Sequence, residues 1–403
     1  MSERRRNARH SSQERREPGE HRRSRSRANT PAPLLLNWQR LPAKRLFDTA
    51  ALSEAWDRLN AARGALPFLD TDVLQLAFAA FRPKGVELLV GKIAEQTQCM
   101  LLVQRVGFGR WQLYQPSQIP LGPLVAAGNL PLDGIARSAL QALPFGTLVL
   151  SFTQLDPRHW PPPVEPACVV KRYISTGWID CAQPFDRYWA ARSANLRASV
   201  GKAQRRLETE GRTLRLRVLT EPADMAAAVE RYGALETSGW KGRKGTAVAA
   251  NTPQGNFYRD WLQAAAAHGE ARVYELLLSE PATPDTAGAL PASSSTTNGS
   301  ATNRHDQTER TIAADLCVVR GDALILLKIA YDEAFERYSP STLLRREFMQ
   351  DVLGSGRVRR VEFFGRLMDW HRRWTGEQRS LYHLTTFRWR WLARLRAPSS
   401  DRL

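Results

Sequence analysis

The sequence is poor in cysteine, and its cysteines show no arrangement typical of a metal site. Four are scattered along the 403 residues: Cys99, Cys168, Cys181 and Cys317. No pair has the spacing of a zinc knuckle or a redox motif, and four cysteines in a chain of this length do not make a disulfide framework. His371 and His383 are too far apart to serve as paired metal ligands on a helix. We therefore expect a protein of the reducing cytoplasm that holds no metal ion.

Long apolar runs are absent as well. No stretch of about 18 uninterrupted apolar residues occurs, so no membrane-spanning helix is expected. The arginine-rich N-terminus has no apolar segment behind it, which argues against a secretory signal. The chain does have 43% apolar and 24% charged residues, the balance of a globular protein with a sizeable core. Its length suits two ordinary domains with tails.

The charge of the chain is strongly basic, with a formal net value of +18. Residues 1–30 carry ten arginines and four acids, a net of +6, and almost no large apolar side chain, so we expect a disordered tail. This tail is either merely solvated or an electrostatic arm for RNA or for the inner membrane surface. The other +12 lies in the folded part and suits a cofactor that bears phosphates.

Residues 31–165 have a mixed pattern of helices and strands. A short helix is expected at 52–59, and 73–81 fits either a helix or a strand. Strands are expected at three apolar runs, of which the first two form a hairpin: 86–93, 99–106 and 143–152. Residues 116–131, rich in glycine and proline, are expected to form a loop, and three prolines at 161–163 mark a domain boundary.

Residues 166–395 form the second predicted domain. Apolar residues at helical spacing predict one helix that begins at a capping Asp186, runs through Leu207 and ends at Gly211. A strand at 214–219 and a helix capped by Thr220 follow. The remaining expected elements alternate between helices and strands: a helix at 256–268, strands at 272–278, 313–319 and 323–331, a helix at 343–353 ended by Gly354, and a strand at 359–364 before a basic aromatic tail.

A low-complexity stretch interrupts this second domain. Residues 279–310 are rich in alanine, serine, threonine and proline, so we expect a disordered insertion at a hairpin tip. Arg320-Gly321-Asp322 lies between two apolar runs and is interpreted as a turn, not as a cell-adhesion motif.

The feature most informative about function is the order strand, polar loop, helix start, strand between residues 323 and 364. The loop Tyr338 to Thr342 opens directly into the helix, whose unpaired N–H groups and positive dipole end favour a phosphate. Arg345 and Arg346 in the first turn oppose the dipole, an effect that a bound anion would reverse. Equally, Ser341 or Thr342 could simply cap the helix.

Four ordered pieces of the chain carry a family resemblance. The core piece is Lys328-Ile329-Ala330-Tyr331-Asp332-Glu333 with Ser339-Pro340 and Leu343-Leu344. The other pieces are Arg205-Arg206-Leu207 with Gly211, Glu236 to Gly242 with Gly245-Thr246, and Glu362 to Gly365 with Trp374. Together they resemble the BioF2-like GNAT acetyltransferases, which include proteins named for cellulose biosynthesis (CelD-like) and are related to Fem-type aminoacyl transferases. The resemblance spans about 170–390 and, more weakly, the first half.

The resemblance implies a fold and a reaction. The fold is of mixed α/β type, with tandem GNAT-like units whose central sheets are flanked by helices, the first unit being degenerate. The implied reaction is transfer of an acyl group, acetyl above all, from acyl-CoA to an amine or hydroxyl. The strand 323–331 would offer a backbone N–H to the thioester oxygen. Two departures are Ser341, where the family commonly has glycine, and Trp370-His371, where it favours an aromatic-lysine pair.

The residues assigned to these roles follow from the resemblance. The proposed catalytic residues are Glu362, Asp332 and His371 as proton acceptors and Tyr331 as the proton donor to the thiolate. The proposed cofactor-binding residues are Lys328, Ser339, Pro340, Ser341, Thr342, Leu343 and Arg345. Trp240 and Lys241 are assigned to the acceptor. Each also has an ordinary structural interpretation: a polar strand residue, a packed tyrosine, a helix cap or an exposed lysine.

Three functions remain open at this point. The first is acyl transfer from acyl-CoA to a sugar, a cell-envelope precursor or a small amine. The second is transfer of an aminoacyl group from charged tRNA, which the +12 charge of the folded part suits. The third is a non-catalytic GNAT scaffold in a polysaccharide-synthase or envelope complex. Salt-sensitive binding of tRNA would favour the second function.

Overall fold

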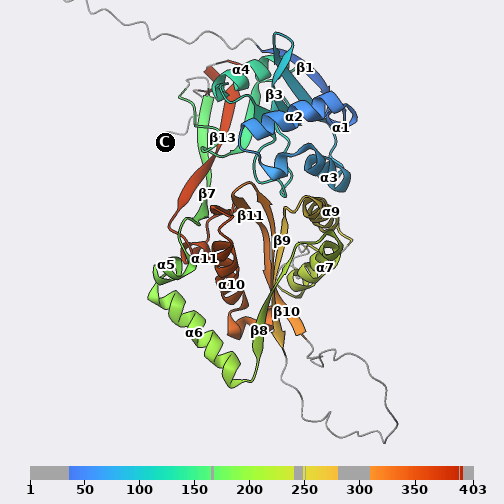
Figure 1. Ribbon diagram of the computed structural model, residues 1–403. Coiled ribbons are helices and arrows are strands. Elements are labelled where there is room, and N and C mark those ends of the chain that lie inside the picture. Colours follow the sequence, from blue (N-terminus) through green and yellow to red (C-terminus); the bar gives the residue numbers. More distant parts are fainter. Residues whose placement is uncertain are drawn as a thin grey trace, which may run out of the picture. The chain divides into compact units, whose positions relative to one another are not determined.

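The computed structural model describes residues 36–164, 168–239, 248–249, 251–279, 309–389 and 391–393 (Figure 1). The expected basic tail at 1–30 and the loop that contains Trp240 and Lys241 lie outside these residues. Most of the expected insertion at 279–310 does as well, although Ser279, Glu309 and Arg310 belong to strands. Of the helices in the described ranges, none combines the length and the apolar character needed to cross a bilayer.

The first half of the chain builds one part of a continuous sheet. Its strands are β1 (Asn37–Pro42), β2 (Val86–Ile93), β3 (Gln96–Gly107), β4 (Arg110–Leu113), β5 (Leu124–Ala126) and β6 (Val149–Leu155). Its helices are α1 (Arg45–Asp48), α2 (Ala50–Ala62), the 3-10 turn η1 (Pro67–Leu69), α3 (Thr71–Phe81) and α4 (Leu132–Ala142). The segment at 73–81 is thus a helix, and the hairpin of β2 and β3 is confirmed.

The second half contributes the rest of the sheet. Its strands are β7 (Cys168–Asp180), β8 (Thr213–Leu219), β9 (Ala271–Ser279), β10 (Glu309–Arg320), β11 (Ala323–Tyr331), β12 (Arg360–Glu362) and β13 (Gln378–Phe387). Its helical elements are α5 (Phe185–Ala190), α6 (Ala194–Thr209), α7 (Pro222–Ser238), α9 (Pro253–Ala267), η3 (Glu333–Tyr338), α10 (Pro340–Ser355) and α11 (Asp369–Arg372). The expected turn between β10 and β11 is confirmed, with Gly321 at a φ of 58°.

The strand order repeats itself about the centre of the sheet. It runs β1-β2-β3-β4-β6-β13-β7-β12-β11-β10-β9-β8. In each half, antiparallel strands lead to one parallel pair that a helix connects: β4 and β6 through α4, and β11 and β12 through α10. An antiparallel strand then follows on the far side of each pair, β13 beside β6 and β7 beside β12. The chain therefore has a tandem fold of two similar units, as expected from the sequence.

Helices cover both faces of the second half's sheet. α5, α6 and α10 pack on one face, in a core that includes Leu196, Leu343 and Phe348. α7 and α9 pack on the other face, around Tyr232 and Trp261. Figure 1 shows α10 and the α7–α9 pair on opposite sides of β9 and β10. Buried apolar area on both sides of the strands accounts for their nearly continuous apolar sequences.

Several expected elements need correction. The single helix expected from Asp186 is two helices, α5 and α6, because Ser193 interrupts the first and caps the second by accepting a hydrogen bond from the Leu196 N–H at 3.2 Å. The helix expected from Thr220 has Glu221 as its N-cap. The strand expected at 143–152 begins only at Val149. The expected basic aromatic tail contains the ten-residue strand β13, and β7 and β1 were not expected at all.

Candidate active site

The two central strands of the second half, β11 and β12, pair over only three residues each. β11 and β12 pair in parallel from Ala323–Ile325 to Arg360–Glu362. Beyond this point β11 continues to Tyr331 along β10. The chain after β12 instead follows β7, since the Phe363 N–H donates to the Gly177 carbonyl at 3.2 Å. We call the point after Ile325 and Glu362, where the strands part, the fork.

The helix that follows β11 starts without a side-chain cap. α10 begins at Pro340, and its N-cap Ser339 has a left-handed backbone (φ 53°, ψ 54°) and makes no side-chain capping bond. The N–H groups of Thr342 and Leu343 donate to the Ser339 carbonyl at 2.9 and 3.1 Å. Neither Ser341 nor Thr342 is therefore the cap, which corrects that alternative. Both hydroxyl residues are half-buried at the positive end of a 16-residue helix.

Arg345 points into the protein core, although it lies in the second turn of this helix. Its guanidinium lies 2.8 Å from a carboxylate oxygen of Asp315 on β10, and both side chains are 4% exposed. Arg345 also lies over the ring of Phe348 at 4.6 Å. Burial raises the pKa of Asp315 to about 6, against the opposing effect of Arg345. Since this guanidinium faces the core, it holds Asp315 and does not face an anion at the start of the helix.

Lys328 and Tyr331 lie on β11 beyond the fork. The Lys328 ammonium lies 5.5 Å from the ring centre of Tyr258, so it faces α9, on the side of the sheet opposite α10. Tyr331, at the end of the strand, is 36% exposed. Burial and the charges of Glu336 and Glu333 raise the pKa of its phenol, which therefore remains a proton donor at neutral pH.

Asp332 is engaged on both carboxylate oxygens. One oxygen accepts a hydrogen bond from the Ala334 N–H at 3.0 Å and thereby caps η3. The other lies 2.6 Å from Arg310. The side chain is buried, and removal of a proton from a substrate would require one of these contacts to break. The arrangement is that of a helix cap and an ion pair.

Glu362 is the last residue of β12 and stands at the fork. Its carboxylate contacts three arginines: Arg360 at 2.7 Å, Arg379 at 2.8 Å and Arg158 at 3.3 Å. Burial raises the pKa of Glu362, while Arg379 and Arg360 act in the opposite direction. The net direction is upward, toward the range in which a carboxylate accepts protons at neutral pH.

His371 lies in α11 and contacts Phe363, the residue that follows Glu362. Its Nδ1 accepts a hydrogen bond from the Met368 N–H at 2.9 Å, which leaves Nε2 to carry the proton of the neutral ring. The imidazole stacks on Trp370 with ring centres 3.6 Å apart and contacts Phe363. Burial and the charge of Arg345 lower the pKa of His371 to about 4.

The expected catalytic residues thus fall into two groups. Glu362 stands at the fork and His371 contacts Phe363, the residue next to it, whereas Tyr331 and Asp332 lie six and seven positions along the chain from Ile325. The expected acceptor residues Trp240 and Lys241 lie outside the described part of the chain.

A buried polar pair that the sequence analysis did not single out also contacts β11. The Tyr232 hydroxyl lies 2.6 Å from Glu236 Oε1 and 3.1 Å from the Ile329 carbonyl. The other oxygen of Glu236 accepts a hydrogen bond from the Val248 N–H at 2.8 Å. Burial raises the pKa of Tyr232 well above its usual value. Two polar residues four positions apart on an otherwise apolar helix face were the available sequence signal.

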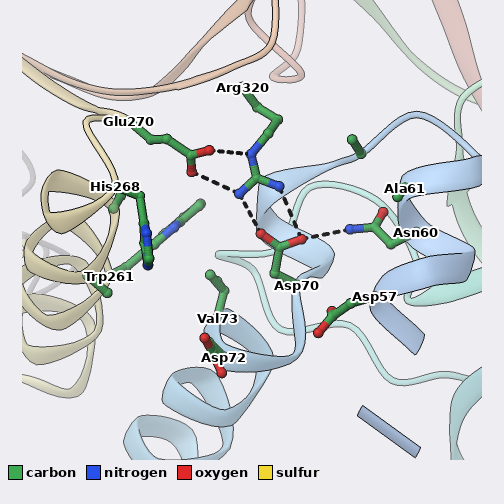
Figure 2. A pocket seen from close by; sticks show the side chains of 13 residues that line it. Asp57, Asn60, Ala61, Asp70, Asp72, Val73, Trp261, His268, Glu270 and Arg320 are labelled. Carbon is green, nitrogen blue, oxygen red and sulfur yellow. Dashed lines mark hydrogen bonds and ion pairs between the residues drawn. The ribbon is translucent and has the colours of Figure 1, made fainter. Parts of the chain in front are cut away.

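A cavity of about 410 Å³ lies between α2, α3 and α9 (Figure 2). Four carboxylates line it: Asp57, Asp70, Asp72 and Glu270. Arg320 bridges two of them, with contacts of 2.6 Å to Asp70 and 2.7 Å to Glu270, as Figure 2 shows. Trp261 and His268 add aromatic surface. Since four acids face one arginine, the cavity favours a cation.

Comparison with known proteins agrees with this topology. Residues 194–282 and 300–372 match the family model described as an acetyltransferase (GNAT) domain. The parallel strands β11 and β12 and the connecting α10 lie within that range. Residues 194–372 are therefore similar to GNAT acetyltransferase domains. No curated protein matches the chain in sequence.

Solved structures of similar arrangement include three named proteins. The C-terminal domain of a putative lysylphosphatidylglycerol synthetase from Agrobacterium fabrum is 12% identical, with 85% of this chain and 94% of that chain covered and a TM-score of 0.48. A tandem GNAT protein of the clavulanic acid pathway is 14% identical, with coverages of 88% and 99% and a TM-score of 0.43. FemX is 10% identical, with coverages of 85% and 98% and a TM-score of 0.49.

Proposed function

We propose that the protein transfers an acyl group from acyl-CoA to an amine. The observation that carries the proposal is the fork between the parallel strands β11 and β12, followed directly by the uncapped start of α10. A thioester arm can lie along the edge of β11 that β12 leaves after Ile325. A pyrophosphate can then lie against the Ser341 N–H and the hydroxyls of Ser339, Ser341 and Thr342.

The chemistry at the fork is a direct displacement. The amine nitrogen forms a bond to the thioester carbon, the carbon–sulfur bond breaks, and the CoA thiolate leaves. N–H groups on the free edge of β11 stabilise the developing negative charge on the carbonyl oxygen. The bond from Tyr232 to the Ile329 carbonyl supports a fixed position for this segment.

Two protons move during this reaction. Glu362 is our first choice to accept the proton of the amine, because it stands at the fork and burial raises its pKa. Tyr331 is the proposed donor of a proton to the thiolate. His371 is the second choice as the proton acceptor, since a pKa of about 4 makes its imidazole a weak base. Asp332 and Arg345 are given structural roles, because Asp332 caps η3 away from the fork and Arg345 holds Asp315 in the core.

The acidic cavity supports an amine as the acceptor. Its carboxylates suit a cationic group, and Trp261 on its wall stacks with Tyr258, which in turn lies against Lys328 of β11. A series of side-chain contacts therefore connects the cavity with the strand that would bind the thioester. More specifically, the protein is proposed to belong to the BioF2-like group, with an amino sugar or a cell-envelope precursor as its acceptor.

The test is calorimetric titration with CoA and acetyl-CoA of two variants at one position. Ser341→Glu adds a negative charge at the start of α10, where the helix dipole tolerates it, but where it repels a pyrophosphate. We expect at least tenfold weaker binding of CoA. Ser341→Gln has the same size without the charge and is the matched control; its affinity should stay within about threefold of the parent.

Equal affinity of the two variants for CoA would show that the pyrophosphate does not bind at the start of α10. Absence of binding to both ligands, in a protein that unfolds cooperatively, would reject acyl-CoA as the donor. Titration with charged tRNA would then distinguish the aminoacyl transferase from the non-catalytic scaffold.

A further inference from the structure

Three chain segments that are distant in sequence meet at one end of the first half's sheet. The turn between β3 and β4 contacts the loop before β6, since the N–H of Leu148 donates to the Gly109 carbonyl at 2.7 Å. The segment after β13 joins them through Arg388. Its side chain donates to the carbonyls of Thr147 at 2.5 Å and Leu140 at 2.7 Å, and its N–H donates to the Leu148 carbonyl.

Each of these segments exposes large aromatic side chains. Phe108 is 86% exposed and Phe145 is 81% exposed. Trp389 and Trp391 are 40% and 56% exposed, and their rings stack with centres 6.2 Å apart. We call these four residues the aromatic rim. Such exposure of large apolar side chains, gathered from three segments at one place, marks a surface of interaction.

The surroundings of the aromatic rim are basic. Arg105 and Arg110 flank Phe108 and are exposed, and the Arg388 guanidinium lies 5.8 Å from the ring centre of Phe145. In sequence, the three segments 104–111, 143–149 and 387–393 contain no aspartate or glutamate. The rim therefore combines apolar tips with positive charge and lacks acids of its own.

We propose that the aromatic rim docks the protein on an anionic lipid surface. Tryptophan favours the boundary between head groups and acyl chains, where its ring is buried and its indole N–H stays hydrated, and phenylalanine adds apolar area that lipid can bury. Arginines beside them pair with lipid phosphates. The charge complementarity with anionic head groups, together with projecting apolar tips, favours a lipid surface over a protein partner.

This inference does not depend on the proposed acyl transfer. The rim belongs to the turn between β3 and β4, the loop before β6 and the segment after β13, whereas the fork belongs to β11 and β12. Variants in the rim leave the residues of the fork untouched. Binding of CoA is expected to be the same in the rim variants and in the parent, so the two proposals fail separately.

The experiment measures flotation of the full chain with vesicles. The vesicles contain equal parts of phosphatidylglycerol and phosphatidylcholine, and vesicles of phosphatidylcholine alone serve for comparison. The test variant combines Phe145→Ser, Trp389→Ser and Trp391→Ser. The control is Ile93→Ser, which removes an apolar side chain of 39% exposure at the opposite end of the β2–β3–β4 meander. The arginine-rich segment 1–30 is present in all these proteins, so differences between them report on the rim.

We expect the triple variant to bind the anionic vesicles at least tenfold more weakly than the parent, with Ile93→Ser unchanged. Binding of the parent to phosphatidylcholine alone should be at least tenfold weaker than to the mixed vesicles. Equal binding of the triple variant and the parent would overturn the proposal. So would a loss of tRNA binding in the triple variant with vesicle binding unchanged, since the rim would then stack on nucleic acid.

Discussion

Burial sets the direction of the pKa shift of single buried groups around the fork. Asp315 faces one arginine, and burial raises its pKa to about 6. Glu362 faces three arginines, and burial still raises its pKa. Burial and the charge of Arg345 lower the pKa of His371 to about 4. Acids and base thus shift toward the neutral form, as desolvation requires.

His371 makes a testable contribution to the pH dependence of stability. In the unfolded chain the His371 imidazole binds a proton near pH 6.5, whereas in the folded chain it stays neutral down to about pH 4. The contribution of His371 to the free energy of unfolding is therefore fully present above pH 6.5 and is lost as the pH falls toward 4, by up to about 3 kcal/mol. Urea unfolding of the parent and of His371→Gln between pH 4 and 7 measures it.

The variant is expected to lose less stability in acid than the parent does. Identical slopes for His371→Gln and the parent would show that the ring is protonated equally in the folded and unfolded states.

At the scale of elements, β13 holds the two units together. It pairs with β6 on one side and with β7 on the other. Arg379 near its start contacts Asp156, after β6, at 2.7 Å and Glu362, on β12, at 2.8 Å. One side chain thus forms ion pairs with two buried carboxylates from different chain segments.

Replacement of Arg379 by methionine is expected to be strongly destabilising. Asp156 and Glu362 would lose their shared partner while remaining buried, at a cost of about 3–5 kcal/mol. The matched control is Arg40→Met, whose ion pair with Glu87 is partly exposed and should contribute less than about 1 kcal/mol. Chemical denaturation at pH 7 gives both values. A loss below about 1 kcal/mol for Arg379→Met would show that water reaches the two acids.

The sequence predicted the elements whose patterns are local. β9, β10 and β11 and the helix after them follow from apolar runs, turn residues and glycines, and their ends differ by a few residues at most. β13 was not predicted, because polar and charged residues interrupt its apolar ones and its strand partners are more than 200 residues away in the chain. The partners of Arg345 and Glu362 could not be predicted either, since they come from other strands.

For the whole molecule, the repeated strand order has a consequence for stability. The first unit receives β13 from the far end of the chain, so residues 36–164 alone leave the edge of β6 unpaired. That edge contains the buried Leu150 and Phe152. An exposed apolar edge strand favours aggregation.

We therefore expect the fragment 36–164 to aggregate or to unfold without cooperativity. The same fragment joined by a flexible linker to residues 376–393 should be soluble and unfold in one transition. Light scattering and thermal unfolding followed by circular dichroism compare the two. A monomeric, cooperatively folded fragment without residues 376–393 would show that β13 is dispensable for the first unit.

The position of β13 also matters while the protein is being made. β6 ends at Leu155 and β13 begins at Gln378, so more than 200 residues are synthesised before the first unit can complete its sheet. At ribosomal rates of about 5–20 residues per second, this delay is roughly 10 to 45 seconds. During that time the nascent chain presents an open strand edge to the cell.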